Sequence, residues 1–180
     1  MIAVIAAFTA GALTWTLLEY VLHRWAGHAL KGKIHFSREH LRHHAVFGYF
    51  TPNGQKVAAA LATAGLALLA TVPWLGPWVG AAYTVGLVGM YLVYEAVHRT
   101  LHVAAPASAY GRWARAHHFA HHFTDARMNH GVTSPLWDLV FRTRLAPHTI
   151  AVPRKHAMRW LLTPEGEVHP DWRPSYTLRA

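Results

Sequence analysis

The chain has 180 residues, the length of one domain, and 53% of them are hydrophobic while only 14% are charged, which is apolar for a soluble protein. A net charge of +9 raises nucleic acid as a partner, but Lys and Arg are absent from residues 1–23 and 57–98, a distribution typical of membrane proteins. We therefore expect no nucleic-acid partner. Cysteine is absent, which excludes disulfides and thiolate-bound zinc or iron–sulfur centres within this chain.

Three stretches are apolar over the ~20 residues that a helix needs to cross a bilayer. They cover approximately residues 2–22, 55–73 and 77–97. The first has no basic segment before it and no polar cleavage region after it, so we expect a retained span rather than a signal peptide. The positive-inside rule places both basic regions in the cytoplasm, as a cap made of residues 23–54 and 98–180. The sequence predicts one all-α domain, an integral membrane helical bundle with a cytosolic, helical, His-rich cap.

The first span ends with Glu19, His23 and His28. The two histidines are five positions apart, about 140° on a regular helix, so they share a site only if the helix ends or bends between them. Gly27 makes such a change plausible. Either histidine alone also fits a polar residue at the level of the lipid headgroups.

A polar loop then leads, with Ser37 as N-cap, into a helix that carries HLRHH. His40, His43 and His44 therefore lie close together on one helix in the spacing H-x-x-H-H. His35 lies outside this pattern and is expected at the surface or in support of a ligand. The aromatic residues of VFGYF, 46–50, suit a membrane interface or the mouth of a substrate site.

The second and third spans read as a tight hairpin, whose small residues allow close packing in lipid. Glu95 lies near its cytoplasmic end, as Glu19 does in the first span. An acid near the membrane is costly unless paired, so we expect each glutamate to accept a hydrogen bond from the N–H of a metal-bound imidazole. Solvation of the two acids at the interface is the alternative.

His98 and His102 follow Glu95 with the four-residue spacing that places two imidazoles on one helix face. The segment YEAVHR, 94–99, echoes LEYVLHR, 18–24. This echo suggests two related halves that meet at one site, although so short a similarity also arises by chance.

Two registers compete in HHFAHH, residues 117–122. His118, His121 and His122 repeat the H-x-x-H-H spacing, whereas His117 and His121 form a rival pair four apart. The parallel with HLRHH favours the first register. His130 follows closely enough to matter, and the basic, Pro-rich tail from residue 144 contains dispersed histidines that we do not expect to be ligands.

Neutral imidazole is a common ligand of iron, zinc and copper. The four histidine motifs described above, called boxes below, together hold more imidazoles than one ion accepts. Ten histidines divide naturally between two metals with about five ligands each, leaving a position open for O2 on paired redox iron. A lipid substrate would place its polar end at the cytoplasmic surface and its chain between the helices. The ten predicted ligands are His23, His28, His40, His43, His44, His98, His102, His118, His121 and His122.

The order of the boxes, followed by HGVTSPLWDLVFRT, resembles the membrane fatty acid hydroxylase and sterol desaturase superfamily over residues 18–143. It is most similar to the fatty acid 2-hydroxylase branch, through EYVLHR, the box from His98 to His102 and the GVTSPLWDLVFRT ending. The resemblance implies a non-haem di-iron monooxygenase that hydroxylates a C–H bond with O2. It also implies that the ten histidines are the ligands and that two electrons come from a separate electron-transfer protein.

Two departures and two rivals bear on this interpretation. The family usually has four spans rather than three, and no haem electron-carrier domain is present in these residues. Carotenoid ring hydroxylases and sterol-type oxidases or desaturases share similar boxes, so the substrate stays open. A His-rich metal transporter or buffer fits less well, because the second and third spans carry no His, Asp or Glu at mid-membrane. Imidazole-rich sites also accept zinc in a purified protein.

Overall fold

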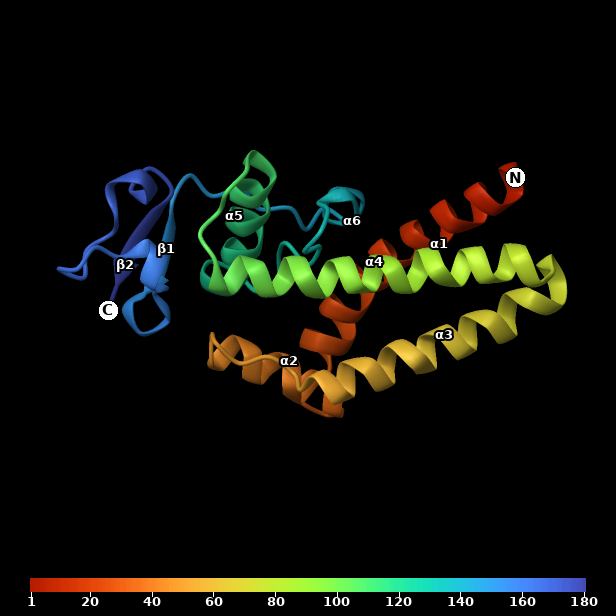
Figure 1. The fold of residues 1–180 in the computed structure, drawn as a ribbon. Helices are drawn as coiled ribbons and strands as arrows, with labels where there is room; N and C mark the ends of the chain where they lie inside the picture. The colour runs from red at the N-terminus through yellow and green to blue at the C-terminus, as the bar shows by residue number, and fades with distance from the viewer.

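A computed structural model describes all 180 residues as a mostly helical protein (Figure 1). The α-helices are α1 (Ile2–Val21), α2 (His35–Ala45), α3 (Asn53–Leu75), α4 (Pro77–Val103), α5 (Ala109–Phe123) and α6 (Leu136–Val140). A π-helix, η1 (Leu22–Ala29), continues α1, and short 3-10 turns η2, η3 and η4 cover Arg154–His156, Arg159–Leu161 and Pro170–Trp172. The strands are β1 (Ile150–Pro153) and β2 (Tyr176–Arg179).

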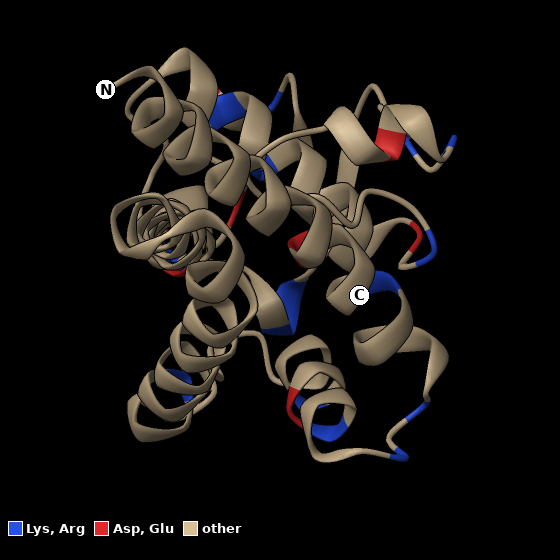
Figure 2. Ribbon diagram, turned by 90° about the vertical axis from the view of Figure 1, so that its right-hand side faces the viewer, with Lys and Arg blue, Asp and Glu red and all other residues tan.

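Three helices are long and apolar enough to cross a membrane: Ile2–Ala29, Asn53–Leu75 and Pro77–Val103. The expected membrane helical bundle is thereby confirmed. In Figure 2 these long helices are almost entirely free of coloured Lys, Arg, Asp and Glu residues. The third helix runs beyond the predicted span, so it carries His98 and His102 on one continuous helix up to Val103.

Glycines let α1 and α4 pack with their backbones in contact. A Cβ atom on Gly11 would lie 2.0 Å from the Tyr83 carbonyl oxygen, and one on Gly86 would lie 2.0 Å from that of Phe8. We expected the small residues to serve the hairpin of α3 and α4, but in that hairpin Gly80 contacts α3 whereas Gly86 faces α1. In Figure 1 the C-terminal part of α1 crosses α4, and Glu19 and His23 line one cavity together with Tyr94 and His98 of α4.

The π-helix η1 resolves the spacing problem at the end of the first span. In such a helix each N–H bonds to the carbonyl five residues back, as from Leu30 to Trp25 at 3.1 Å. Residues five apart then lie one above the other, so His23 and His28 face the same side. Gly27 lies between them and allows the ring of His40 to approach, since a Cβ there would be 2.9 Å from His40 Cδ2.

The cap has a hydrophobic core of its own. Phe119, Ala120 and Phe123 of α5 pack against the C-terminal segment, where β1 and β2 form a parallel two-stranded sheet. The sequence places this tail in the cap, and the small sheet is not predicted by the sequence. Its contacts bury the outer face of α5, so the histidine-bearing face of that helix turns toward α2 and α4.

Candidate metal centre

The structure gathers the ten predicted histidines into two groups of five, in each of which the facing ring nitrogens lie within 4.8 Å of one another. The first group contains His23, His28, His40, His44 and His121. The second group contains His43, His98, His102, His118 and His122. No histidine outside the ten belongs to either group.

The two groups are interleaved rather than divided between the halves of the chain. The first takes four histidines from residues 23–44 and His121 from α5, whereas the second takes His43 from α2 and four from residues 98–122. The rings of His44 and His122 stack with centroids 4.0 Å apart and so join the groups. Helices α2 and α5 therefore contribute to both groups.

Hydrogen bonds fix which nitrogen of several rings carries the proton. His23 Nδ1 lies 2.5 Å from the carbonyl oxygen of His130, and His121 Nδ1 lies 2.7 Å from that of Met128. A carbonyl oxygen only accepts, so each Nδ1 is the donor and each Nε2 of these neutral rings carries a lone pair. The two Nε2 atoms face each other at 2.9 Å. Two lone pairs at this distance repel unless a cation lies between them.

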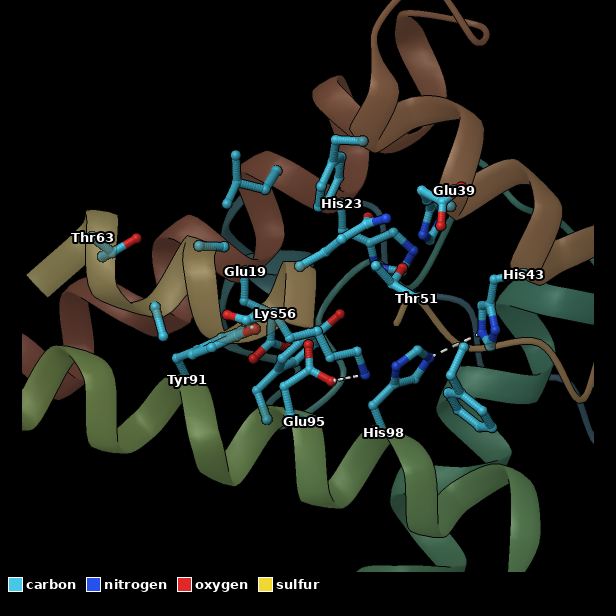
Figure 3. Close-up of a pocket in the computed structure, with 18 of the residues that line it drawn as sticks. Glu19, His23, Glu39, His43, Thr51, Lys56, Thr63, Tyr91, Glu95 and His98 are labelled. Atoms are coloured by element: carbon cyan, nitrogen blue, oxygen red, sulfur yellow. Dashed lines mark hydrogen bonds and ion pairs between the residues drawn. The ribbon is translucent and has the colours of Figure 1, made fainter. Parts of the chain in front are cut away.

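One histidine of the second group repeats this arrangement, whereas Nδ1 of His102, His118 and His122 is buried without a hydrogen-bond partner. His43 Nδ1–H donates to the carbonyl oxygen of Tyr49 at 2.7 Å, so its Nε2 is unprotonated and faces His98 Nε2 at 3.0 Å. His118 Nε2 lies 2.8 Å from His102 Nε2 and 3.1 Å from His122 Nε2. Figure 3 shows His43 and His98 pointing toward one another.

The nitrogen separations match those of ligands around one ion. In the first group, neighbouring Nε2 atoms lie 2.8 to 3.1 Å apart. Two metal–nitrogen bonds of about 2.0–2.1 Å at a right angle place their nitrogens about 2.9 Å apart. The donor set therefore fits one imidazole-bound transition metal per group, with geometry closer to octahedral or square-pyramidal than to tetrahedral.

Burial keeps the histidines of the two groups neutral. It lowers the pKa of His43 to about 4, against the opposing effect of its bond to Tyr49. Burial and the neighbouring histidines also lower the pKa of His121 and His122 well below the usual range. A ligand must be unprotonated to bind a metal, so these rings are ready to bind at neutral pH.

Neither predicted glutamate bonds an imidazole of the two groups. The buried carboxylate of Glu19 accepts from the backbone N–H groups of Val132 and Thr133 and from the Thr133 hydroxyl. Glu95 instead forms an ion pair with Lys56. The expectation of a direct bond was therefore wrong for both acids, because α1 directs Glu19 at the loop around residue 132 and the hairpin sets Glu95 opposite α3.

A carboxylate that the sequence did not single out organises this loop. Asp138, fully buried, accepts from the backbone N–H groups of His130 and Gly131 at 2.9 and 2.8 Å. It also accepts from Thr143 Oγ1 at 2.8 Å and from His117 Nε2 at 3.1 Å. Burial alone would raise the pKa of Asp138, but these hydrogen bonds hold it below the usual value. Asp138 thereby fixes the carbonyl group that orients a histidine of the first group.

The remaining histidines fall outside the two groups. His118 joins the second group, as the H-x-x-H-H register predicts, whereas His117 bonds Asp138. His35 bonds Gln55 at 2.8 Å, and His130 contributes its backbone carbonyl rather than its ring to the His23 contact. The tail histidines, His148, His156 and His169, belong to neither group.

A cavity of about 310 Å³ adjoins both groups. At one end it is lined by histidines of each group, including His40 and His43, and at the other by apolar residues of the long helices, including Trp15 and Ala60. Figure 3 shows it enclosed by α1, α2, α3 and α4, with Thr63 at the end away from His43. An elongated ligand with one polar end fits this gradient of polarity.

The chain is similar in sequence to a known protein family and to several of its members. A family described as fatty acid hydroxylase matches residues 8–143, which include all ten histidines. The chain belongs to the fatty acid hydroxylase family. It is 34% identical over 151 residues to dihydroceramide fatty acyl 2-hydroxylase FAH2 of Arabidopsis thaliana, covering 79% of this chain and 61% of that protein. It is 30% identical to fatty acid 2-hydroxylase of Rattus norvegicus, covering 77% of this chain and 39% of that protein.

A solved structure extends the family relationship to the fold. Full-length scs7p, in which only the hydroxylase domain is visible, superposes with a TM-score of 0.61 at 28% identity, covering 80% of this chain and 56% of that chain. The chain thus spans less than two thirds of the length of each of these relatives. Within the family match, the loop that binds Glu19 and Asp138 lies near the end of the matched region, and residues 144–180 with their small sheet lie beyond it.

Proposed function

We propose that this domain hydroxylates a C–H bond of a lipid at a non-haem di-iron site, with one iron in each group of five histidines. The observation that carries the proposal is the convergence of imidazole Nε2 atoms, 2.8 to 3.1 Å apart, beside a cavity that becomes apolar away from them. The names of relatives that act on fatty acids and on the fatty acyl chain of dihydroceramide support a fatty acyl substrate.

Bound iron would supply O2 activation, in which the substrate C–H bond, O2, two electrons and two protons yield an alcohol and water. The chain's residues do the positioning. The carbonyl groups of Met128, His130 and Tyr49 hold the Nδ1–H atoms of three histidines, so their Nε2 lone pairs are directed without rearrangement. Trp15 and Ala60 line the cavity away from the histidines and keep water from the lipid chain.

We also propose how the domain lies in the membrane and where its electrons come from. The three apolar helices hold it in the membrane, and the positive-inside rule puts the histidine groups on the cytoplasmic side. Two electrons are needed per hydroxylation, and we propose that a separate electron-transfer protein delivers them from the cytoplasm. A reporter fused after Ala180 tests the orientation, which is refuted if a tag in the turn between Trp74 and Trp78 is also cytoplasmic.

Metal content and product formation test the chemistry together. We expect two metals per chain, iron in active protein and zinc in some preparations, and hydroxylated lipids in cells that express it. His118→Ala should lose metal and product, whereas His169→Ala, half-buried in the tail and outside both groups, should keep both. A wild-type protein that is active with fewer than two metals, or a His118→Ala variant with normal product, contradicts the di-iron proposal.

A further inference from the structure

A lysine–glutamate ion pair lies inside the cavity, beside the second group of histidines. Lys56 comes from the start of α3 and Glu95 from α4, and their side chains are 18% and 22% exposed. Both line the cavity. Figure 3 shows them facing each other, with His98 next along α4. The direct bond to an imidazole that we expected for Glu95 is thus replaced by a contact with the cavity's lysine.

The pair lies about one helical turn from His98, a histidine of the second group. Glu95 precedes His98 by three residues, which is about 4.5 Å along a helix and on neighbouring positions of its surface. The Tyr91 hydroxyl donates to the Lys56 carbonyl oxygen at 3.2 Å and so holds the start of α3 against α4. If the pair bound the polar head of a ligand, the ligand carbons next to that head would lie about one helical turn from His98.

The other acids of the cavity already have their partners. Glu19 is bound through both oxygens by residues 132 and 133, and Glu39 accepts from the Tyr49 hydroxyl. In the ion pair, Glu95 uses one of its carboxylate oxygens, as Glu39 does, and Lys56 uses one of its three N–H donors. The pair therefore keeps both a donor and an acceptor for a ligand.

We propose that Lys56 and Glu95 bind the polar head of the lipid and select an uncharged head that both accepts and donates hydrogen bonds, such as an amide. This inference rests on the proposed function of the cavity. An amide oxygen accepts from Lys56 while its N–H donates to Glu95. An ionised carboxylate gains Lys56 but meets the like charge of Glu95 at low dielectric and has no proton to donate.

Binding of two matched ligands tests the inference. Hexadecanamide and hexadecanoate share one chain and differ only in the head, and their affinities are measured on purified, metal-containing protein at a pH where hexadecanoate is ionised. We expect wild type to prefer the amide by ~10-fold or more, the scale of discrimination that paired polar groups supply. Glu95→Gln, which leaves Lys56 as an unopposed cation, should lower this preference by ~10-fold or reverse it.

A surface pair supplies the matched control. Glu167 contacts Arg154 at 3.4 Å with both side chains more than half exposed, so Glu167→Gln removes the same charge without touching the cavity. It should leave the amide preference unchanged. Equal metal content in all three proteins shows that the histidine groups have formed, so a changed preference is not caused by misfolding.

The outcomes separate the two proposals. Equal binding of both ligands by wild type, or an unchanged preference in Glu95→Gln with normal metal content, overturns the head-group site. Selective amide binding by iron-loaded protein that hydroxylates neither ligand, even with electrons supplied, supports the head-group site and overturns the hydroxylase proposal.

Discussion

Replacing Gly27 by alanine separates the stability of the helix from the geometry of the metal centre. The new Cβ would lie 2.9 Å from His40 Cδ2 and 3.2 Å from Cγ. Carbon atoms pack best at about 3.5–4.0 Å, so the ring must move by roughly 0.5 Å or more. Metal–ligand distances tolerate only about 0.2 Å. The displacement is therefore large for a ligand, although it is small for an ordinary side chain.

The two effects have opposite signs. Alanine is favoured over glycine inside a helix by about 0.5–1 kcal/mol, so the metal-free Gly27→Ala protein should be as stable as wild type or slightly more stable. Metal affinity of the first group should fall ~10 to 100-fold, the effect of disturbing a ligand's support. Titration with a competing chelator and thermal unfolding of the metal-free protein measure the two quantities separately.

Gly65→Ala is the matched control, because Gly65 also lies in a helix and has nothing within 4 Å of a Cβ. It should change neither metal affinity nor activity. Wild-type affinity at both sites in Gly27→Ala would refute the argument, since it would mean that the close approach of Gly27 to His40 does not set the position of that ring.

Other predictions concern the support of the two groups. Asp138→Ala should destabilise the protein by about 3–5 kcal/mol in thermal or denaturant unfolding, because four donors lose a buried acceptor; normal stability would show that water replaces the carboxylate. Metal-free protein should lose stability as pH falls from 6.5 toward about 4, since the folded state lowers the pKa of His43 to about 4 and binds fewer protons than the unfolded state; a flat profile in that range contradicts this. Arg115 donates to the carbonyl oxygens of Leu101 and Thr100 at 2.8 and 3.1 Å and so holds the end of α4. Arg115→Ala should therefore lower metal retention in the second group, whereas Arg112→Ala should not.

The spacing of the histidines predicted which of them gather at the site, because helical periodicity is local, but it did not predict how they divide between the two groups. His118 and His122 project from one face of α5 whatever else the chain does, and the H-x-x-H-H register chose His118 over His117. The membrane spans were equally accessible, since apolar length and the absence of Lys and Arg are properties of the sequence. These features depend on neighbours within about two helical turns.

The partners of the rings were not predictable in the same way. The atoms that bind the Nδ1–H groups of His23 and His121 are backbone carbonyls, which every residue has, so no side-chain pattern marks them. The π-helix depends on a shift of hydrogen bonds by one residue that tertiary contact sustains. The direction of Glu95 depends on Lys56, which lies 39 residues earlier and meets it only because α3 and α4 form a hairpin.

The interleaving of the groups changes what metal binding means for folding. Because His43 and His121 each join a group made mainly from the other half of the sequence, neither proposed metal can be bound completely by one half alone. Binding free energy at either ion therefore acts on the packing of α2 against α5, and the stacked rings of His44 and His122 pass that order to the neighbouring group. Binding of one metal orders the ligands of the other metal before the other metal binds. The two metals should therefore bind cooperatively rather than independently. The short repeat of LEYVLHR and YEAVHR does not mark two separate metal-binding halves, because each half contributes one histidine, His43 or His121, to the group made mainly by the other half.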